Sequence, residues 1–179
     1  MKILNFGSVN IDFIYRVPHF VRPGETLAAG SVTRNAGGKG FNQSVALAKA
    51  GCTVYHAGHI GSDGVFLKEL CKKYGIHTDY LTEVTAPTGN AIIQVDDNGA
   101  NSIILFGGAN QTMDEAFIQE VLGNFEKGDM IVLQNEINCM NELISMAHDA
   151  GLAIAINPAP MNDAISPEKL ALCDWLILN

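Results

Sequence analysis

The sequence predicts one α/β domain with three layers, in which helices cover both faces of a mostly parallel sheet. Short apolar runs that end at glycine or proline alternate with stretches of helical periodicity, which is the pattern of repeated βαβ units. The runs 130–133 and 152–156 are apolar throughout, as strands buried on both faces are. A chain of 179 residues is long enough for a single hydrophobic core.

The predicted elements follow in order along the chain. "KILNFGSV" (2–9) and "TVYHAGHI" (53–60) are strands, and the helical stretch "NQSVALAKAG" (42–51) lies between them. The later elements are helices at 65–76, 113–125 and 141–151 and strands at 129–136, 152–158 and 174–179. Because strands in α/β proteins normally lead into a further helix, and this sequence stops after an apolar strand, we expect the C-terminal part of the fold to be missing.

Two stretches interrupt this alternation. Residues 12–35 contain alternating apolar residues and two prolines, and residues 88–106 contain two β-rich runs around "DDNG", a hairpin-type turn signal. We predict that both stretches form strands outside the parallel sheet, as a small β-sheet lid on the α/β body. The alternative is an ordinary antiparallel extension of one sheet edge. Residues 1–179 are then the N-terminal part of one domain, with lid strands at about 12–35 and 88–106.

The charge and hydropathy of the chain exclude several classes of partner. Eleven basic against nineteen acidic side chains give a net charge of −8, and Lys and Arg form no run. Nucleic acid and anionic membrane surfaces are therefore poor partners. No apolar run approaches the ~20 residues of a membrane span, and the N-terminus lacks the features of a secretory signal. We expect a cytoplasmic protein.

The cysteines and histidines do not indicate a metal site. Cys52, Cys71, Cys139 and Cys173 are irregularly spaced without a CxxC pair, as reduced thiols are. His56 and His59 have a spacing that could meet a metal on a helix, but their segment is β-branched and interrupted by glycine. We interpret them as partly buried histidines of a strand and loop.

Polar residues follow the ends of several predicted strands. Asn10 and Asp12 follow the first strand, and three more follow later ones: Glu136, Asn157 and Asn179. Because ligands of open parallel sheets bind beyond the carboxyl ends of the strands, we expect these side chains to gather at one edge.

The segment "NAGGKGFNQSVALAKAG" (35–51) contains a glycine-rich entry to a helix. It fails the Walker phosphate-loop pattern, because Thr33 stands at the place of the first glycine and Gly40 follows Lys39. The first backbone N–H groups of a helix are unpaired, and Lys39 and Asn42 add side-chain donors. Such a site suits a neutral polyhydroxylated ligand as well as an anion. The alternative is a glycine-rich turn with a solvated lysine.

Carboxylates would supply the acceptors opposite these donors. Asp12 and Glu136 are acceptors when ionised, and a ligand rich in hydroxyl groups needs both kinds of partner. This combination indicates sugar recognition. The alternatives are a turn-forming role for Asp12 and a position beside the N-cap of the next helix for Glu136.

Several motifs in order resemble the ribokinase-like, phosphofructokinase-B type carbohydrate kinases. They are "GSVNID" (7–12), "PGET" (23–26), the glycine-rich segment 35–51, "GSDGVF" (61–66), "PTGNAIIQV" (87–95), "GGAN" (107–110), "QNE" (134–136) and "NPAP" (157–160). They span almost the whole chain, and "NPAP" with "GSVNID" favours the ribokinase branch. The resemblance implies a sugar kinase with a three-layer α/β/α body and a β-sheet lid, through which such proteins often form homodimers.

The resemblance also implies roles for individual residues. Asn10 and Asp12 match positions that bind sugar hydroxyls, and the segment containing Gly38, Lys39 and Asn42 matches one that lines the same sugar. Glu136 matches a position near sugar and lid. Asn179 matches the first residue of an N-E-x-E motif beside the nucleotide phosphates and the metal. The implied cofactors are ATP and Mg²⁺, with a monovalent cation left open as a third.

One expected motif is absent from the sequence. The catalytic base of these kinases is the Asp of a G-A-G-D motif, which this chain does not contain, so no catalytic residue and no metal ligand is assigned. We expect the full-length protein to transfer phosphate from ATP to a sugar hydroxymethyl group, with this chain providing the lid and most of the sugar site. The alternative is a non-catalytic sugar-binding module or an inactive truncated fragment.

Other activities are also considered. A dinucleotide-binding α/β enzyme is disfavoured, because "GGKGFN" lacks the GxGxxG spacing. Within the resembling family, nucleoside kinases and fructose-phosphate kinases remain open, and the sequence does not identify the sugar.

Overall fold

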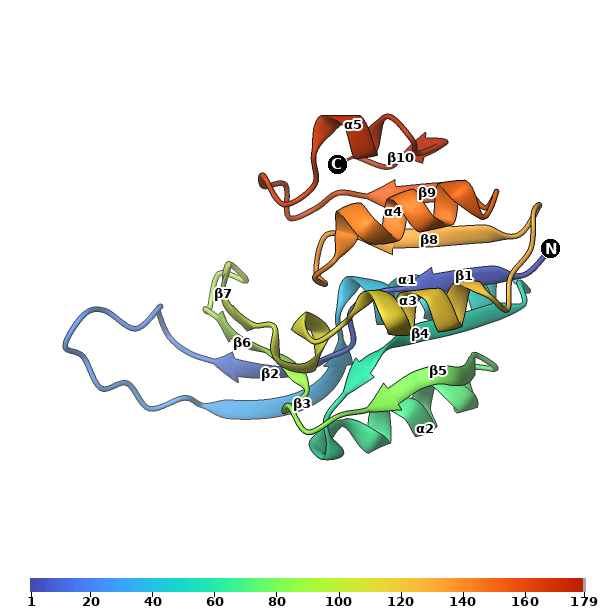
Figure 1. Ribbon diagram of the computed structural model, residues 1–179. Helices are drawn as coiled ribbons and strands as arrows, with labels where there is room; N and C mark the ends of the chain where they lie inside the picture. The colour runs from blue at the N-terminus through green and yellow to red at the C-terminus, as the bar shows by residue number, and fades with distance from the viewer. Residues whose placement is uncertain (179) are drawn as a thin grey trace.

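The larger of two sheets has six parallel strands in the order β10-β9-β8-β1-β4-β5 (Figure 1). The structure, a computed structural model, describes residues 1–178. The strands are β1 (Ile3–Phe6), β4 (Val54–Ile60), β5 (His77–Glu83), β8 (Met130–Gln134), β9 (Ala153–Asn157) and β10 (Trp175–Leu176). The sheet is built from βαβ crossovers, as the alternation of apolar runs and helical stretches predicted.

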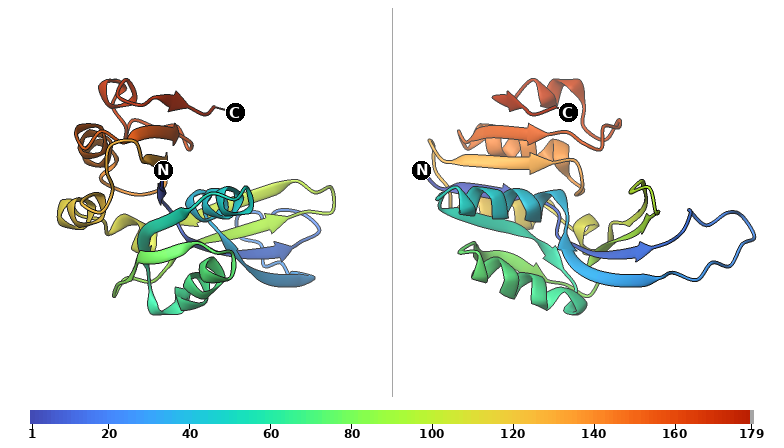
Figure 2. Two further views of the ribbon diagram at one scale, coloured as in Figure 1. Left: turned by 90° about the vertical axis from the view of Figure 1, so that its right-hand side faces the viewer. Right: turned by 180° about the vertical axis from the view of Figure 1, so that it is seen from behind.

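Helices cover both faces of this sheet (Figure 2). One face carries α1 (Lys39–Lys49) and α2 (Val65–Lys73), and the other carries α3 (Glu115–Leu122), α4 (Met140–Asp149) and α5 (Pro167–Leu170). Each face has its own apolar cluster, in which Phe6 packs with α3 and α4 residues and Val54 with α1 and α2 residues. The predicted three-layer α/β class is confirmed. Among residues 1–178, no helix combines the length and hydropathy that a membrane crossing requires.

A second, mixed sheet projects beyond the carboxyl ends of the larger one (Figure 1). Its order is β3-β2-β6-β7, with β2 (Asn10–Arg16), β3 (Ser31–Gly37), β6 (Gly89–Val95) and β7 (Asn101–Phe106). The "DDNG" segment forms the predicted turn between β6 and β7, where Asp96 Oδ1 accepts hydrogen bonds from Asn98 N and Ala100 N. Gly99 has φ +81°, a conformation that glycine adopts without strain.

The register of the small sheet sorts its side chains between two faces. Asp12 pairs with Ala91, and Ala91 pairs with Leu105, so these three residues form one row across the strands. Ile92 pairs with Ile104 one position along and therefore faces the opposite way. One face of the small sheet thus carries a carboxylate among apolar groups, and the other carries exposed isoleucines.

Several elements differ from the sequence-based expectation. Strand β5 was not predicted, because "HTDYLTE" is largely polar and buries only Thr78 and Leu81. The short helices α5 and η2 (Gly108–Gln111) were also not predicted. Helix α1 begins at Lys39, three residues before the predicted start, because Gly38, Lys39 and Gly40 give the segment before Phe41 no apolar periodicity.

His56 is a buried strand residue that links β4 to α1. It has no exposed surface, and its Nδ1 lies 2.8 Å from Ser44 Oγ. Its Nε2 has no hydrogen-bond partner among residues 1–178. Burial lowers the pKa of His56 from 6.5 to about 4, since a charged imidazolium would lose its hydration there.

We expect the free energy of unfolding to fall as the pH decreases from 6.5 to about 4. In this window the unfolded chain binds a proton at His56 that the folded chain does not, so acid favours unfolding. His56 alone should lower the free energy of unfolding by about 2 kcal/mol at pH 5 relative to pH 8. Urea unfolding at both pH values measures this cost. A His56→Gln variant should show a smaller pH dependence, whereas His148→Gln, at an exposed histidine, should match the original chain; equal pH dependence in all three contradicts the prediction.

Candidate functional site

A cavity of about 170 Å³ lies between the small sheet and the start of α1. It is lined by Asn10, Asp12, Gly38, Lys39, Asn42, Ala91, Ile93, Ile103, Leu105 and Glu136. Every described residue that the resemblance placed beside a sugar is in this set. Polar groups of β2, α1 and the β8 end therefore face apolar side chains of β6 and β7, which is the usual composition of a small-molecule site.

Asp12 lies in β2, in the row with Ala91 and Leu105. Its carboxylate occupies space that exists only because residue 37 is glycine: a Cβ on Gly37 would collide with the Asp12 carboxylate. Burial, and secondarily the nearby Glu136 carboxylate, raise the pKa of Asp12 above 3.8. Asp12 is thus a strand residue and not the turn-forming residue considered as an alternative.

Glu136 connects the end of β8 to the start of α1. Its carboxylate accepts hydrogen bonds from Lys39 N (2.9 Å), Lys39 Nζ (2.6 Å) and Ser8 Oγ (2.5 Å). The Glu136 side chain is 10% exposed and that of Lys39 is 40% exposed. The partly buried ion pair fixes the ammonium group at the cavity, and an ammonium has three donors, so others remain for a ligand.

The start of α1 is not a set of free amide donors, as the sequence had suggested. Besides the Lys39 amide, Gly40 N donates to Ser8 Oγ (3.2 Å) and Phe41 N donates to Ser8 O (2.9 Å). Helix N-termini bind anions through unpaired N–H groups, and here protein groups, one of them a carboxylate, already occupy them. The expectation of unpaired amides is therefore wrong, and the site favours a neutral ligand over a phosphate.

Gly38 and Asn42 complete the helix side of the cavity. Gly38 has φ +91°, and a Cβ there would lie 2.9 Å from Ser8 O, so the loop depends on glycine. Asn42 is exposed and lines the cavity, and its backbone N–H donates to Gly38 O (3.0 Å). Its side-chain amide can both donate to and accept from a hydroxyl group.

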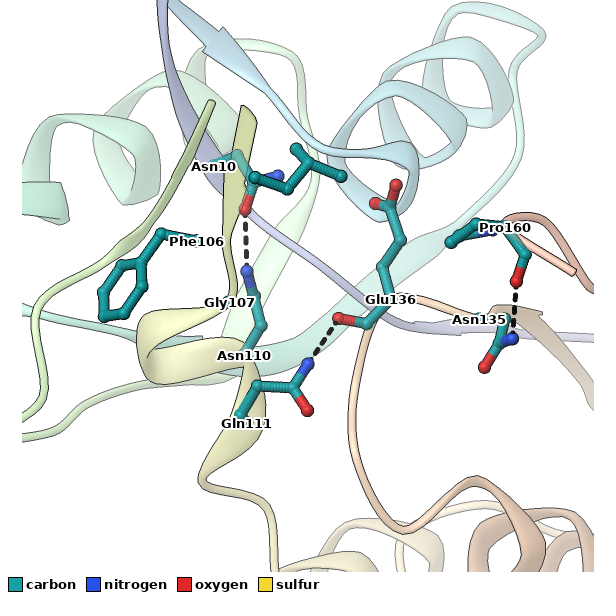
Figure 3. Close-up of a pocket in the computed structure, with 9 residues that line it drawn as sticks. Asn10, Phe106, Gly107, Asn110, Gln111, Asn135, Glu136 and Pro160 are labelled. Carbon is teal, nitrogen blue, oxygen red and sulfur yellow. Dashed lines mark hydrogen bonds between the residues drawn. The ribbon is translucent and has the colours of Figure 1, made fainter. Parts of the chain in front are cut away.

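Figure 3 shows a second cavity, of about 240 Å³. It adjoins the first, since Asn10, Leu105 and Glu136 line both. Its polar lining includes Asn110 and Gln111, which the sequence analysis did not assign to the site. Asn110 Nδ2 donates to Asn10 Oδ1 (2.7 Å), and Gln111 Nε2 donates to Glu136 O (3.0 Å). Both residues thus contact the predicted site residues. The "GGAN" motif (107–110) was the only sequence signal for Asn110, and no sequence signal pointed to Gln111.

One predicted residue of the described part of the chain does not line either cavity. Asn157 ends β9, and its Oδ1 accepts a hydrogen bond from Ala159 N (3.0 Å), so it shapes the following loop. Asn179 lies outside the described residues. Within residues 1–178, no group of three or more His, Cys, Asp or Glu side chains is arranged to hold a metal ion.

Comparison with known proteins assigns the family. The profile described as "pfkB family carbohydrate kinase" matches residues 1–179. The chain belongs to the pfkB family of carbohydrate kinases. A ribokinase from Haemophilus influenzae is 35% identical over 178 residues, which cover 97% of this chain and 58% of that protein.

Solved structures of family members share the fold. A ribokinase from Cryptococcus neoformans in complex with ADP has a TM-score of 0.82 and 37% identity, covering 99% of this chain and 56% of that one. An Arabidopsis thaliana ribokinase complexed with ribose and ATP has a TM-score of 0.85 and 30% identity, covering 99% and 60%. This member of the pfkB family therefore spans somewhat more than half the length of the relatives it matches.

Proposed function

We propose that this chain provides the sugar-binding site and lid of an ATP-dependent sugar kinase that acts on ribose or a similar sugar. The observation that carries the proposal is the convergence of Asp12, Lys39, Asn42 and Glu136 on one cavity beneath the small sheet. Family membership and the ribokinases among the similar proteins support the reaction class.

The chemistry of the cavity supports a neutral polyol as its ligand. Asp12 accepts hydrogen bonds from hydroxyl groups, while Lys39 Nζ and the Asn42 amide donate to hydroxyl oxygens. The apolar side chains of Ile93, Ile103 and Leu105 suit the C–H faces of a sugar ring. Two carboxylates at the cavity disfavour a sugar that already carries a phosphate.

The proposed reaction transfers the γ-phosphoryl group of ATP to the hydroxymethyl oxygen of the sugar. The bond from the γ-phosphorus to the bridging oxygen breaks, a bond to the sugar oxygen forms, ADP leaves, and the hydroxyl proton passes to a base. In this chain Asp12, Lys39 and Asn42 orient the sugar, and we propose that the small sheet acts as a lid that excludes water. No residue of the chain is assigned as the base.

A fusion protein tests this proposal. We expect residues 1–179, joined in register to the C-terminal part of the Haemophilus influenzae ribokinase, to form ADP only when ribose is present. An Asp12→Ala fusion should lose this activity, and an Asp97→Ala fusion, altered at the exposed turn of the small sheet, should keep it. A folded fusion that binds ATP but forms no ribose-dependent ADP contradicts the proposal.

Measurements on the chain alone distinguish part of a sugar kinase from the alternative, a non-catalytic sugar-binding module. Without a G-A-G-D motif, we expect it to bind ribose weakly and to form no ADP in the presence of ATP and Mg²⁺. Tight ribose binding by the chain alone would favour the binding module. Turnover at about 1–100 s⁻¹, as in kinases, would show that the chain is itself complete for catalysis.

We also propose that the chain forms a homodimer through the small sheet. Ile92 is 42% exposed and Ile104 is 62% exposed on the face opposite the cavity, and apolar strand faces of this kind commonly pair with a partner. Ile104→Lys should convert a dimer to a monomer in sedimentation experiments. A chain that is monomeric without this substitution contradicts the proposal.

A further inference from the structure

Asn10 lines both cavities, but its own hydrogen-bonding direction is set by a residue that is 100 positions away in the sequence. The side-chain amide of an asparagine carries an acceptor oxygen and a donor nitrogen, and a rotation of 180° exchanges the two. What Asn10 offers a ligand therefore depends on which of these atoms the protein already binds.

Asn110 of η2 binds the Asn10 side chain (Figure 3) and also the backbone of Val9. Its Oδ1 accepts a hydrogen bond from Val9 N (3.0 Å), and its Nδ2 donates to Val9 O (3.3 Å) and to Asn10 Oδ1 (2.7 Å). Asn110 is only 2% exposed. Its orientation is unambiguous, because a backbone N–H can only donate and so must meet the oxygen of the amide.

The fixed orientation of Asn110 determines that of Asn10. Since Asn110 Nδ2 is a donor, the Asn10 side chain must accept this hydrogen bond with its Oδ1. Asn10 Nδ2 makes no hydrogen bond within residues 1–178. It is not fully buried, because the fully buried side-chain N and O atoms that lack a partner in this part of the chain are His56 Nε2 and Gln134 Oε1. The free donor of Asn10 is thus accessible from the cavity that its side chain lines.

We propose that Asn110 is a positioning residue, which locks the Asn10 amide so that Asn10 presents an N–H donor to an oxygen of the sugar. This inference rests on the proposed sugar site. The site then has an acceptor and a donor at fixed positions: Asp12 accepts a hydrogen bond from one sugar hydroxyl, and Asn10 donates one to another sugar oxygen. Asn110 is not among the residues that line the cavity holding Asp12 and Lys39, whereas Asn10 is, so its effect on the sugar there passes through Asn10.

The Asn110→Asp variant tests this positioning role with almost no change in the shape of the side chain. The carboxylate still accepts from Val9 N but cannot donate, so the Asn10 amide should turn and present its oxygen to the sugar. We expect ribose affinity, measured by NMR titration of the full chain, to fall about tenfold, the value of one hydrogen bond. In an Asn10→Ala background the same substitution should have no further effect. An unchanged affinity, or an equal loss in both backgrounds, overturns the proposal.

A measurement without sugar separates this inference from the proposed function. If the fusion protein forms no ribose-dependent ADP, the function proposal fails, but the orientation of Asn10 is still tested by hydrogen exchange of the side-chain amides. We expect the Asn110 NδH₂ signals to be protected and those of Asn10 to exchange rapidly, with both assigned from alanine variants. Equal protection of the two groups overturns the proposal that Asn110 fixes the orientation of Asn10. This measurement uses the unsubstituted chain, so it also decides the matter if Asn110→Asp does not fold.

Discussion

Replacing Asp12 with alanine is expected to lower the affinity for ribose by about 100-fold, because a carboxylate that accepts two hydroxyl hydrogen bonds is lost. Its partly buried position on the cavity face of the small sheet lets these bonds form away from competing water. NMR titration on the chain measures the change, and the expected result is the loss of detectable ribose binding in the variant. Asp97→Ala, which removes an acid from the exposed turn, is the matched control and should bind as the original chain does.

The loss should not come from unfolding. Burial raises the pKa of Asp12, so at neutral pH its ionised form is less favourable in the folded chain than in the unfolded one. Removing the carboxylate should therefore leave the melting temperature unchanged or raise it. Ribose affinity that is equal in the Asp12→Ala variant and the original chain would exclude Asp12 from the site.

Replacing Gly40 with alanine is expected to lower the free energy of unfolding by roughly 2 kcal/mol, although Gly to Ala usually stabilises a helix by about 0.5–1 kcal/mol. The added Cβ would lie 2.6 Å from Ser8 N and 2.7 Å from Ser8 O and Gly7 C. These are backbone atoms of the loop between β1 and β2, so the helix and not a flexible side chain must move. Urea unfolding measures the change.

Two other glycines serve as controls for Gly40→Ala. A Cβ on Gly30 would have only Arg16 O within 4 Å, at 3.8 Å, so Gly30→Ala should be close to neutral. A Cβ on Gly37 would displace the Asp12 carboxylate, which can rotate away, so Gly37→Ala should retain stability and lose ribose binding. A Gly40→Ala chain as stable as Gly30→Ala would show that the close approach of α1 to the β1–β2 loop is not tight.

Much of the α/β body is predictable from the sequence because its strands and helices carry local signals. The apolar run of β8 and the glycine-terminated pattern of α4 each specify an element without reference to the rest of the chain. Strand β5 shows the limit: it is an edge strand whose burial comes from α2 packing beside it, and its own sequence is mostly polar.

The site is predictable in its residue types but not in its internal pairing. Asp12, Lys39 and Asn42 stand out in the sequence as donors and acceptors near glycines. The pairing of Lys39 with Glu136 spans 97 positions, and that of Asn110 with Asn10 spans 100. Such contacts depend on how β2, α1 and η2 meet in space. This is why the helix start was expected to offer free amides that the structure shows to be paired.

The most direct test of the proposed sugar site is a map of ribose-induced changes in the amide NMR spectrum of this 19.2 kDa chain. We predict that saturable shifts concentrate in Asn10–Asp12, Gly38–Asn42 and the segment around Glu136, with weaker shifts along the inner face of β6 and β7. Galactitol, an open-chain polyol, is the control and should leave these signals unchanged. Shifts confined to other surfaces, or the absence of any saturable change at millimolar ribose, would contradict the assignment of the cavity as a sugar site.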